Sequence, residues 1–69
     1  MPSEHDVVTL TADIPAHGLR VGDVGTVVHC YNQGAAYEVE FVDEHGRTKC
    51  VATVTAAQIM KLNLLSLSA

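Results

Sequence analysis

Apolar and polar side chains alternate most regularly in the stretch YEVEFV, near the middle of the chain. Tyr37, Val39 and Phe41 take every second position. Glu38 and Glu40 take the positions between them. A period of two is typical of a β-strand that has one buried and one solvated face. The pattern therefore predicts a strand with its aromatic and valine side chains in the core.

Two strands are predicted before this one. The β-branched runs DVVTLTAD (residues 6–13) and VGTVVHCY (residues 24–31) have the composition of strands. The segment between them contains Pro15, Gly18 and Gly22, which exclude a regular helix and predict a long exposed loop. A turn at NQGA then leads into the alternating strand.

A hairpin is predicted to follow the alternating strand. The loop DEHG has hairpin length, with Gly46 free to adopt positive φ. Closing the loop there sets the cross-strand pairs as Val42–Arg47, Phe41–Thr48, Glu40–Lys49 and Val39–Cys50. This register brings opposite charges together on the solvated face. The side chains that it turns toward the core are Cys50, Ala52 and Val54.

One helical turn and a final strand complete the predicted elements. Thr55 is suited to cap a single turn at AAQI. Beyond this turn, Met60, Leu62 and Leu64 alternate with polar residues and predict a last strand.

These elements predict an all-β fold, namely a small five-stranded, SH3-like, partly open barrel with one short helical turn before the last strand. The chain has 69 residues, which is the size of one domain. We expect a single domain over residues 1–69. Its ordered core is expected at about 6–64, with tails at 1–5 and 65–69.

The stretch RVGDVGTVV is assigned a structural role. Gly22 and Asp23 are predicted to turn the chain sharply, and Gly25 to let the second strand bend at a barrel corner. The packing at this corner is expected to come from the β-branched side chains Val24, Val27 and Val28.

Several segments together resemble one family of short bacterial proteins. They are Asp6-Val7-Val8, Gly18-Leu19, Gly22-Asp23-x-Gly25-Thr26-Val27-Val28 and Glu38-Val39-Glu40-Phe41. From about Asp6 to about Leu62, the chain is similar to the family known as domain of unknown function 4926. The resemblance implies a small bacterial β-barrel without an assigned activity or catalytic residues.

The charge balance is acidic. Eight Asp and Glu residues against four Lys and Arg residues give a formal net charge of −4. The four cations, Arg20, Arg47, Lys49 and Lys61, are dispersed along the chain, whereas nucleic-acid binding favours a clustered basic face. We therefore expect a protein partner or self-association in preference to a nucleic acid.

No apolar run reaches the ~18 residues of a membrane-spanning helix. The N-terminus also lacks the basic segment followed by an apolar run that marks a secretory signal. We expect no membrane partner and a cytoplasmic location.

No residue set meets the requirements of catalysis. Ser3, Ser66 and Ser68 stand at the chain ends, where a Ser–His pair is not held in a structured site. His29 and Cys30 are neighbours on a predicted strand and point to opposite faces. We therefore predict that the protein is not an enzyme and that Cys30 packs in the core.

Carboxylates and metal-ligating side chains have structural explanations. Glu38 and Glu40 share a strand face at a separation of about 6.5–7 Å, which a solvated face explains. The four histidines lack the close pairs of a zinc site, so no metal ligand or cofactor is predicted. Both cysteines are expected to be reduced.

The C-terminal segment is the candidate interaction surface. Its apolar side chains are Met60, Leu62, Leu64, Leu65 and Leu67. So many apolar groups exceed what the end of such a domain should expose to water. We predict that these five side chains form a protein interface. A last strand buried internally, with a frayed end, explains the same residues, and the sequence leaves both explanations open.

The functional hypothesis that follows is a non-enzymatic protein-interaction module. A more specific form makes the chain the small acidic partner or inhibitor in a bacterial two-protein pair. Two other classes stay open: an RNA- or ribosome-associated barrel that uses the Gly22–Val28 turn, and a metal-binding homo-oligomer. Whether Asp23 contacts a ligand is also left open.

Overall fold

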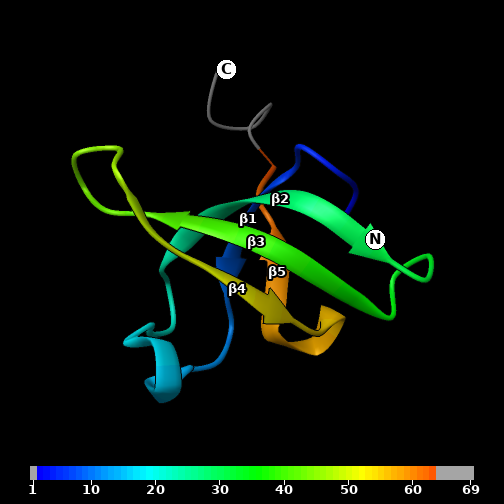
Figure 1. Cartoon of the computed structure of the whole chain (residues 1–69), viewed down its shortest axis with the longest axis horizontal. Helices are drawn as coiled ribbons and strands as arrows, with labels where there is room; N and C mark the ends of the chain where they lie inside the picture. The colour runs from blue at the N-terminus through cyan, green and yellow to red at the C-terminus, as the bar shows by residue number, and fades with distance from the viewer. Residues whose placement is uncertain (1, 64–69) are drawn as a thin grey trace.

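The computed structural model describes residues 2–63 and is built from β-strands (Figure 1). The elements are β1 (Val7–Leu10), η1 (Pro15–His17), β2 (Val24–Tyr31), β3 (Ala36–Val42), β4 (Thr48–Val54), η2 (Ala56–Gln58) and β5 (Ile59–Lys61), where η marks a short 3-10 turn. The strands form one antiparallel sheet in the order β4-β3-β2-β1-β5. The predicted all-β fold with five strands is confirmed.

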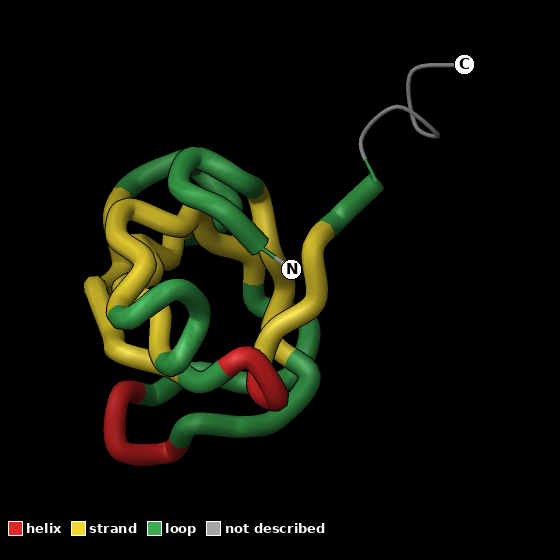
Figure 2. The backbone as a smooth tube through the Cα atoms, turned by 90° about the vertical axis from the view of Figure 1, so that its right-hand side faces the viewer, coloured by secondary structure: helices red, strands yellow, loops and turns green. Residues whose placement is uncertain are grey.

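The sheet curls so that its first strand in the chain, β1, lies beside its last, β5. β1 pairs with β2 on one side and with β5 on the other. β4 and β5 are the two edges of the sheet, and they share no ladder in the described part of the chain. Figure 2 shows the strands curving around a common centre. The architecture is that of a small, partly open barrel.

Inward-facing side chains from all five strands meet in one hydrophobic core. Tyr37, Val39 and Phe41 are fully buried, as their alternation predicts. No charged side chain of residues 2–63 is buried. The other buried side chains are Val8, Leu10, Leu19, Val27, Ala52, Val54 and Ile59. The interior therefore contributes packing, and the polar chemistry lies on the surface.

The segment between β1 and β2 is more ordered than the predicted exposed loop. Ile14 and Leu19 form an isolated antiparallel bridge around η1. Leu19 is buried in the core with 1% of its surface exposed. The expectation of a fully exposed loop is therefore wrong at Leu19, because the bridge folds this residue back over one end of the barrel.

The β3–β4 hairpin departs from the predicted register. The observed pairs are Val42–Thr48, Phe41–Cys50, Glu40–Val51 and Val39–Ala52. The predicted pairs Val42–Arg47, Phe41–Thr48, Glu40–Lys49 and Val39–Cys50 are therefore wrong.

Two local features cause this shift of register. The Asp43 carboxylate accepts hydrogen bonds from the N–H groups of His45 (2.8 Å) and Arg47 (3.0 Å), so the loop extends to Arg47. Lys49 is then an extra residue that the ladder skips. Beyond this bulge the shift is two residues, which leaves each side chain on its original face. The inward side chains of β4 are still Cys50, Ala52 and Val54.

A bulge at Val28 divides β2 into two registers. The flanking pairs are Val27–Val39 and His29–Glu38, so Val28 has no partner on β3. Val27 is fully buried, whereas Val24 and Val28 are 37% and 44% exposed. Of the three valines expected to supply packing at this corner of the barrel, Val27 does so, whereas Val24 and Val28 are exposed. Both lie on the side of β2 opposite Val27.

The last strand begins one residue earlier than predicted. Thr55 precedes η2, and the Gln58 side-chain oxygen accepts a hydrogen bond from the Thr55 N–H at 2.8 Å. β5 starts at Ile59, whose side chain is 6% exposed and joins the core. Met60 consequently faces outward, because neighbouring side chains on a strand alternate.

Gly25 on β2 packs directly against the residues of β3 that lie opposite it. A Cβ atom at this position would stand 2.6 Å from Val39 Cγ1, 2.7 Å from the Glu40 carbonyl oxygen and 3.0 Å from Phe41 Cδ1. The first two separations are far below van der Waals contact. Only glycine fits here without moving the two strands apart.

We predict that Gly25→Ala lowers the free energy of unfolding by about 3 kcal/mol, because the added methyl group overpacks the β2–β3 contact. Urea unfolding measures the loss. Gly46→Ala is the control: Gly46 has open space around it but a φ of 77°, which costs alanine about 1 kcal/mol. A loss at Gly25 no larger than the loss at Gly46 would contradict this interpretation.

A second prediction concerns the Tyr37 hydroxyl, which is buried without a hydrogen-bond partner among residues 2–63. An unsatisfied buried hydroxyl costs about 1–3 kcal/mol. Tyr37→Phe should therefore leave the stability unchanged or raise it, as urea unfolding would show. The control Phe41→Leu, at an equally buried site, should lower the stability. A clear loss in Tyr37→Phe would mean that the hydroxyl has a partner.

Candidate functional site

The side of the sheet opposite the core carries most of the exposed large hydrophobic side chains. The exposed large hydrophobic side chains of residues 2–63 are Val21, Val24, Val28, Tyr31, Val51 and Met60. Val21 lies in the loop before β2, and the other five lie on strands. We call this side of the sheet, with its outward side chains, the outer face.

Two carboxylates stand at the centre of the outer face. Glu40 on β3 pairs with Thr26 on β2 and with Val51 on β4. Glu38, two residues earlier on β3, pairs with His29 on β2 and with Thr53 on β4. This part of the outer face is therefore acidic, and the exposed apolar side chains of the adjacent strands β2 and β4 lie beside it.

The bulge in β2 brings two rings onto the same face as Glu38. Without it, His29 and Tyr31 would follow Val27 into the core, because side chains two residues apart share a face. With it, both rings point outward and contact each other edge to face, with centroids 4.5 Å apart and planes at 73°. The Nδ1 atom of His29 also lies 4.0 Å from the Glu4 carboxylate.

Glu38 is held between two hydroxyl groups. The Tyr31 hydroxyl donates a hydrogen bond to one carboxylate oxygen at 2.8 Å, and the Thr53 hydroxyl donates to the other at 2.9 Å. The bond from Tyr31 and then the bond from Thr53 lower the pKa of Glu38 from its ordinary value. The same hydrogen bond to the Glu38 carboxylate raises the pKa of the Tyr31 phenol. The Glu38 carboxylate therefore stays charged at neutral pH.

The two central carboxylates have no cation of their own. Glu40 accepts a hydrogen bond from the Thr48 hydroxyl at 2.9 Å. Within residues 2–63, no lysine or arginine forms an ion pair with Glu38 or Glu40. Both lysines are engaged elsewhere, in the pairs Lys49–Asp23 and Lys61–Asp6, each at 3.6 Å.

The predicted C-terminal interface lies partly on the outer face. Met60 is 55% exposed and pairs with Thr9 on β1, which pairs in turn with Val24 on β2. Leu62 follows β5, is partly exposed, and its N–H donates to the Val7 carbonyl oxygen at 2.9 Å. The remaining members of the predicted interface, Leu64, Leu65 and Leu67, lie outside the described residues.

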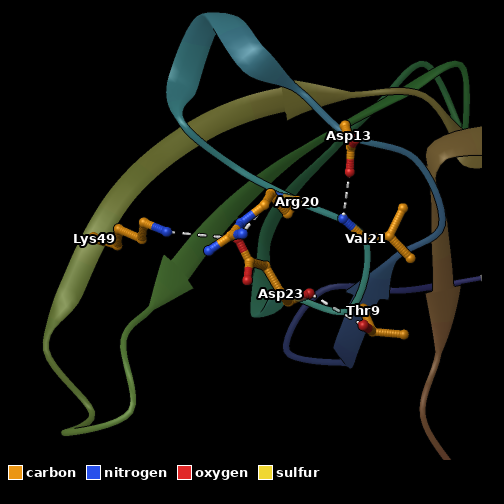
Figure 3. A network of polar contacts seen from close by, with 6 residues as sticks. All are labelled: Thr9, Asp13, Arg20, Val21, Asp23 and Lys49. Atoms are coloured by element: carbon orange, nitrogen blue, oxygen red, sulfur yellow. Dashed lines mark hydrogen bonds and ion pairs between the residues drawn. The ribbon is translucent and has the colours of Figure 1, made fainter.

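The Asp23 carboxylate is engaged by its own chain (Figure 3). It accepts a hydrogen bond from the Arg20 N–H at 3.0 Å and lies 3.6 Å from the Lys49 ammonium. The main-chain carbonyl oxygen of Asp23 accepts a hydrogen bond from the Thr9 hydroxyl at 3.1 Å. Gly22, with a φ of 93°, completes this turn. The contacts of Asp23 therefore hold the turn between Arg20 and β2.

No set of three or more His, Cys, Asp or Glu side chains in residues 2–63 is arranged to hold a metal ion. Cys30 and Cys50 are free thiols that pack partly against the core. The described part of the chain contains no helix of the length and hydrophobicity that crossing a membrane requires.

Sequence reasoning identified the carboxylates of this site and missed their neighbours. Glu38 and Glu40 were expected on one solvated face, whereas His29, Tyr31 and Thr53 were assigned no role. A signal was present: Cys30 was expected in the core, and its neighbours on the strand, His29 and Tyr31, then face outward as Glu38 does.

Comparison with known protein families finds a match over most of the chain. The family model described as Domain of unknown function (DUF4926) matches residues 4–61, which include all five strands and the outer face. No curated protein and no solved structure matches the chain.

We predict that Tyr31→Phe raises the pKa of Glu38 toward its ordinary value, because the leading hydrogen bond to the carboxylate is lost. A lowered folded-state pKa contributes stability above the pKa of the unfolded carboxyl, and this contribution disappears as the pH falls through the folded-state value. The variant should therefore lose less stability on acidification. An NMR titration of the Glu38 carboxyl carbon measures the pKa.

The control for this titration is Thr53→Val, which removes the second hydrogen bond and should raise the same pKa by a smaller amount. An unchanged Glu38 pKa in Tyr31→Phe would show that the hydrogen bond does not form in solution.

Proposed function

The chain belongs to the DUF4926 family, and we propose that it is a non-enzymatic protein-interaction module that binds its partner on the outer face. The family description names no activity, so the proposal rests on the surface of this chain. We further propose that it acts in the bacterial cytoplasm as the small acidic member of a two-protein pair, for example as an inhibitor.

The observation that carries the proposal is the concentration of exposed apolar side chains on one face. Val28 and Tyr31 on β2 and Val51 on β4 lie beside the two carboxylates of β3, and Val24 on β2 and Met60 on β5 continue the exposed apolar surface across β1. Exposed apolar groups gathered on one face favour association, because a partner removes them from water. A small barrel gains stability from such a partner.

The polar groups of this face fit recognition better than catalysis. Glu38 is bound by two hydroxyl groups that keep it ionised. A general acid or base instead works best with a pKa close to neutrality. The His29 and Tyr31 rings beside Glu38 are exposed, and water at this surface weakens the electrostatic interactions that an enclosed catalytic site would strengthen.

The RNA-binding alternative has weaker support. The Gly22–Val28 turn carries Asp23, and the neighbouring Lys49 is already paired with that carboxylate. A phosphate group approaching this turn would meet a negative charge and a neutralised cation.

The proposal predicts that apolar-to-acidic substitutions on the outer face abolish partner capture. Affinity-tagged wild-type chain, Val28→Asp, Met60→Asp and the control Val21→Asp would be cross-linked in a lysate of the native host, and the cross-linked sites identified by mass spectrometry. Val21 is 60% exposed but lies off the sheet. Capture of a specific protein should fall at least about tenfold in the two face variants, as expected for contacts worth above about 1.4 kcal/mol, and persist in Val21→Asp.

Equal capture by all four proteins, or cross-links that avoid the outer face, would contradict the proposal. Amide NMR spectra of the variants would confirm that each one is folded. Sedimentation of the purified chain tests whether the partner is a second copy of the same chain. A dimer that dissociates in the Met60→Asp variant would support the outer face as the binding surface.

A further inference from the structure

The centre of the outer face has an uncompensated negative charge. Glu38 and Glu40 occupy neighbouring outward positions of β3, and the lysines of the chain are paired with Asp6 and Asp23. Glu4 adds a third carboxylate, 4.0 Å from the His29 ring. A partner that covers this face must supply cations of its own, because a buried and unpaired carboxylate is strongly destabilising.

The spacing of the two carboxylates defines how such cations would be arranged. Side chains at positions i and i+2 of a strand are about 6.5–7 Å apart. An extended partner segment places its own i and i+2 side chains at the same separation. Two cationic residues separated by one residue therefore match Glu38 and Glu40.

The groups around Glu38 favour a guanidinium over an ammonium ion. Each Glu38 oxygen accepts one hydrogen bond, from Tyr31 or from Thr53, which leaves acceptor capacity on both oxygens for a planar, two-pronged donor. The adjacent Tyr31 ring is 37% exposed and offers a surface on which a guanidinium can stack. Lysine has neither the planar fork nor the stacking surface.

We propose that the outer face binds an extended protein segment with the pattern Arg-x-Arg, in which one arginine pairs with Glu38 beside Tyr31 and the other pairs with Glu40. This inference rests on the proposed function and specifies its partner. The exposed Val28 and Val51 flank the two carboxylates on β2 and β4 and would contact the rest of the partner.

The test is an NMR titration of the purified, isotope-labelled chain with the acetylated and amidated peptide Gly-Ser-Arg-Ser-Arg-Ser-Gly. The comparison peptides replace both arginines with citrulline, which is neutral and of the same shape, or with lysine. We expect saturating shifts of the Glu38, Glu40 and Thr53 amides with the arginine peptide, weaker binding of the lysine peptide and no binding of the citrulline peptide.

The matched variants are Glu38→Gln, Glu40→Gln and the control Glu44→Gln, which changes an exposed carboxylate in the β3–β4 loop. Each of the first two should weaken binding about fivefold, which corresponds to a surface ion pair of about 1 kcal/mol. Glu44→Gln should leave the dissociation constant within twofold of the wild type. Their amide spectra would report whether each variant is folded.

Equal weakening by all three glutamine variants would overturn the proposal, because attraction would then follow the net charge alone. Equal affinity for the lysine peptide would overturn the assignment of arginine. Absence of peptide binding, together with a partner that still cross-links to the outer face, would remove the Arg-x-Arg assignment and leave the proposed function standing. Absence of peptide binding together with cross-links that avoid the outer face would contradict both the Arg-x-Arg assignment and the proposed function.

Discussion

The pairing of β3 on both of its sides is the constraint on which the rest of the structure depends. Its inward side chains are fully buried, and each of its edges is hydrogen-bonded to a neighbouring strand. The strands paired with β3 must therefore turn side chains toward the core at the positions that lie opposite its buried residues. The register against β3 therefore decides which residues of β2 and β4 enter the core and which form the outer face.

The all-β class, the burial of alternate β3 residues and the inward face of β4 were predictable, because each depends on a period of two that local sequence displays. The hairpin register was not predictable, since it depends on the hydrogen bonds of Asp43 and on the bulge at Lys49. Beyond the bulge the error was two residues, which left the faces of Cys50, Ala52 and Val54 correct. Thr48, predicted opposite Phe41, instead lies opposite Val42 and faces outward. A one-residue error would have inverted the strand.

The candidate site was likewise predictable only in part. Glu38 and Glu40 were placed correctly on a solvated face, but their relation to His29 and Tyr31 depends on the bulge at Val28. A bulge is favoured by the packing of the whole sheet, and local composition does not mark it. The turn at Asp23 is the reverse case, because its carboxylate bonds within a few residues and its structural role was visible in the sequence.

The outer face depends on β3 and on the bulge in the neighbouring strand β2, so the most direct test is the register of β2 against β3 in solution. Nuclear Overhauser effects between backbone protons across the strands report this register for the purified chain. The account predicts contacts of Glu38 with His29 on one side and with Thr53 on the other. Contacts of Glu38 with Val28 in place of His29 would show an unbroken ladder and would contradict it.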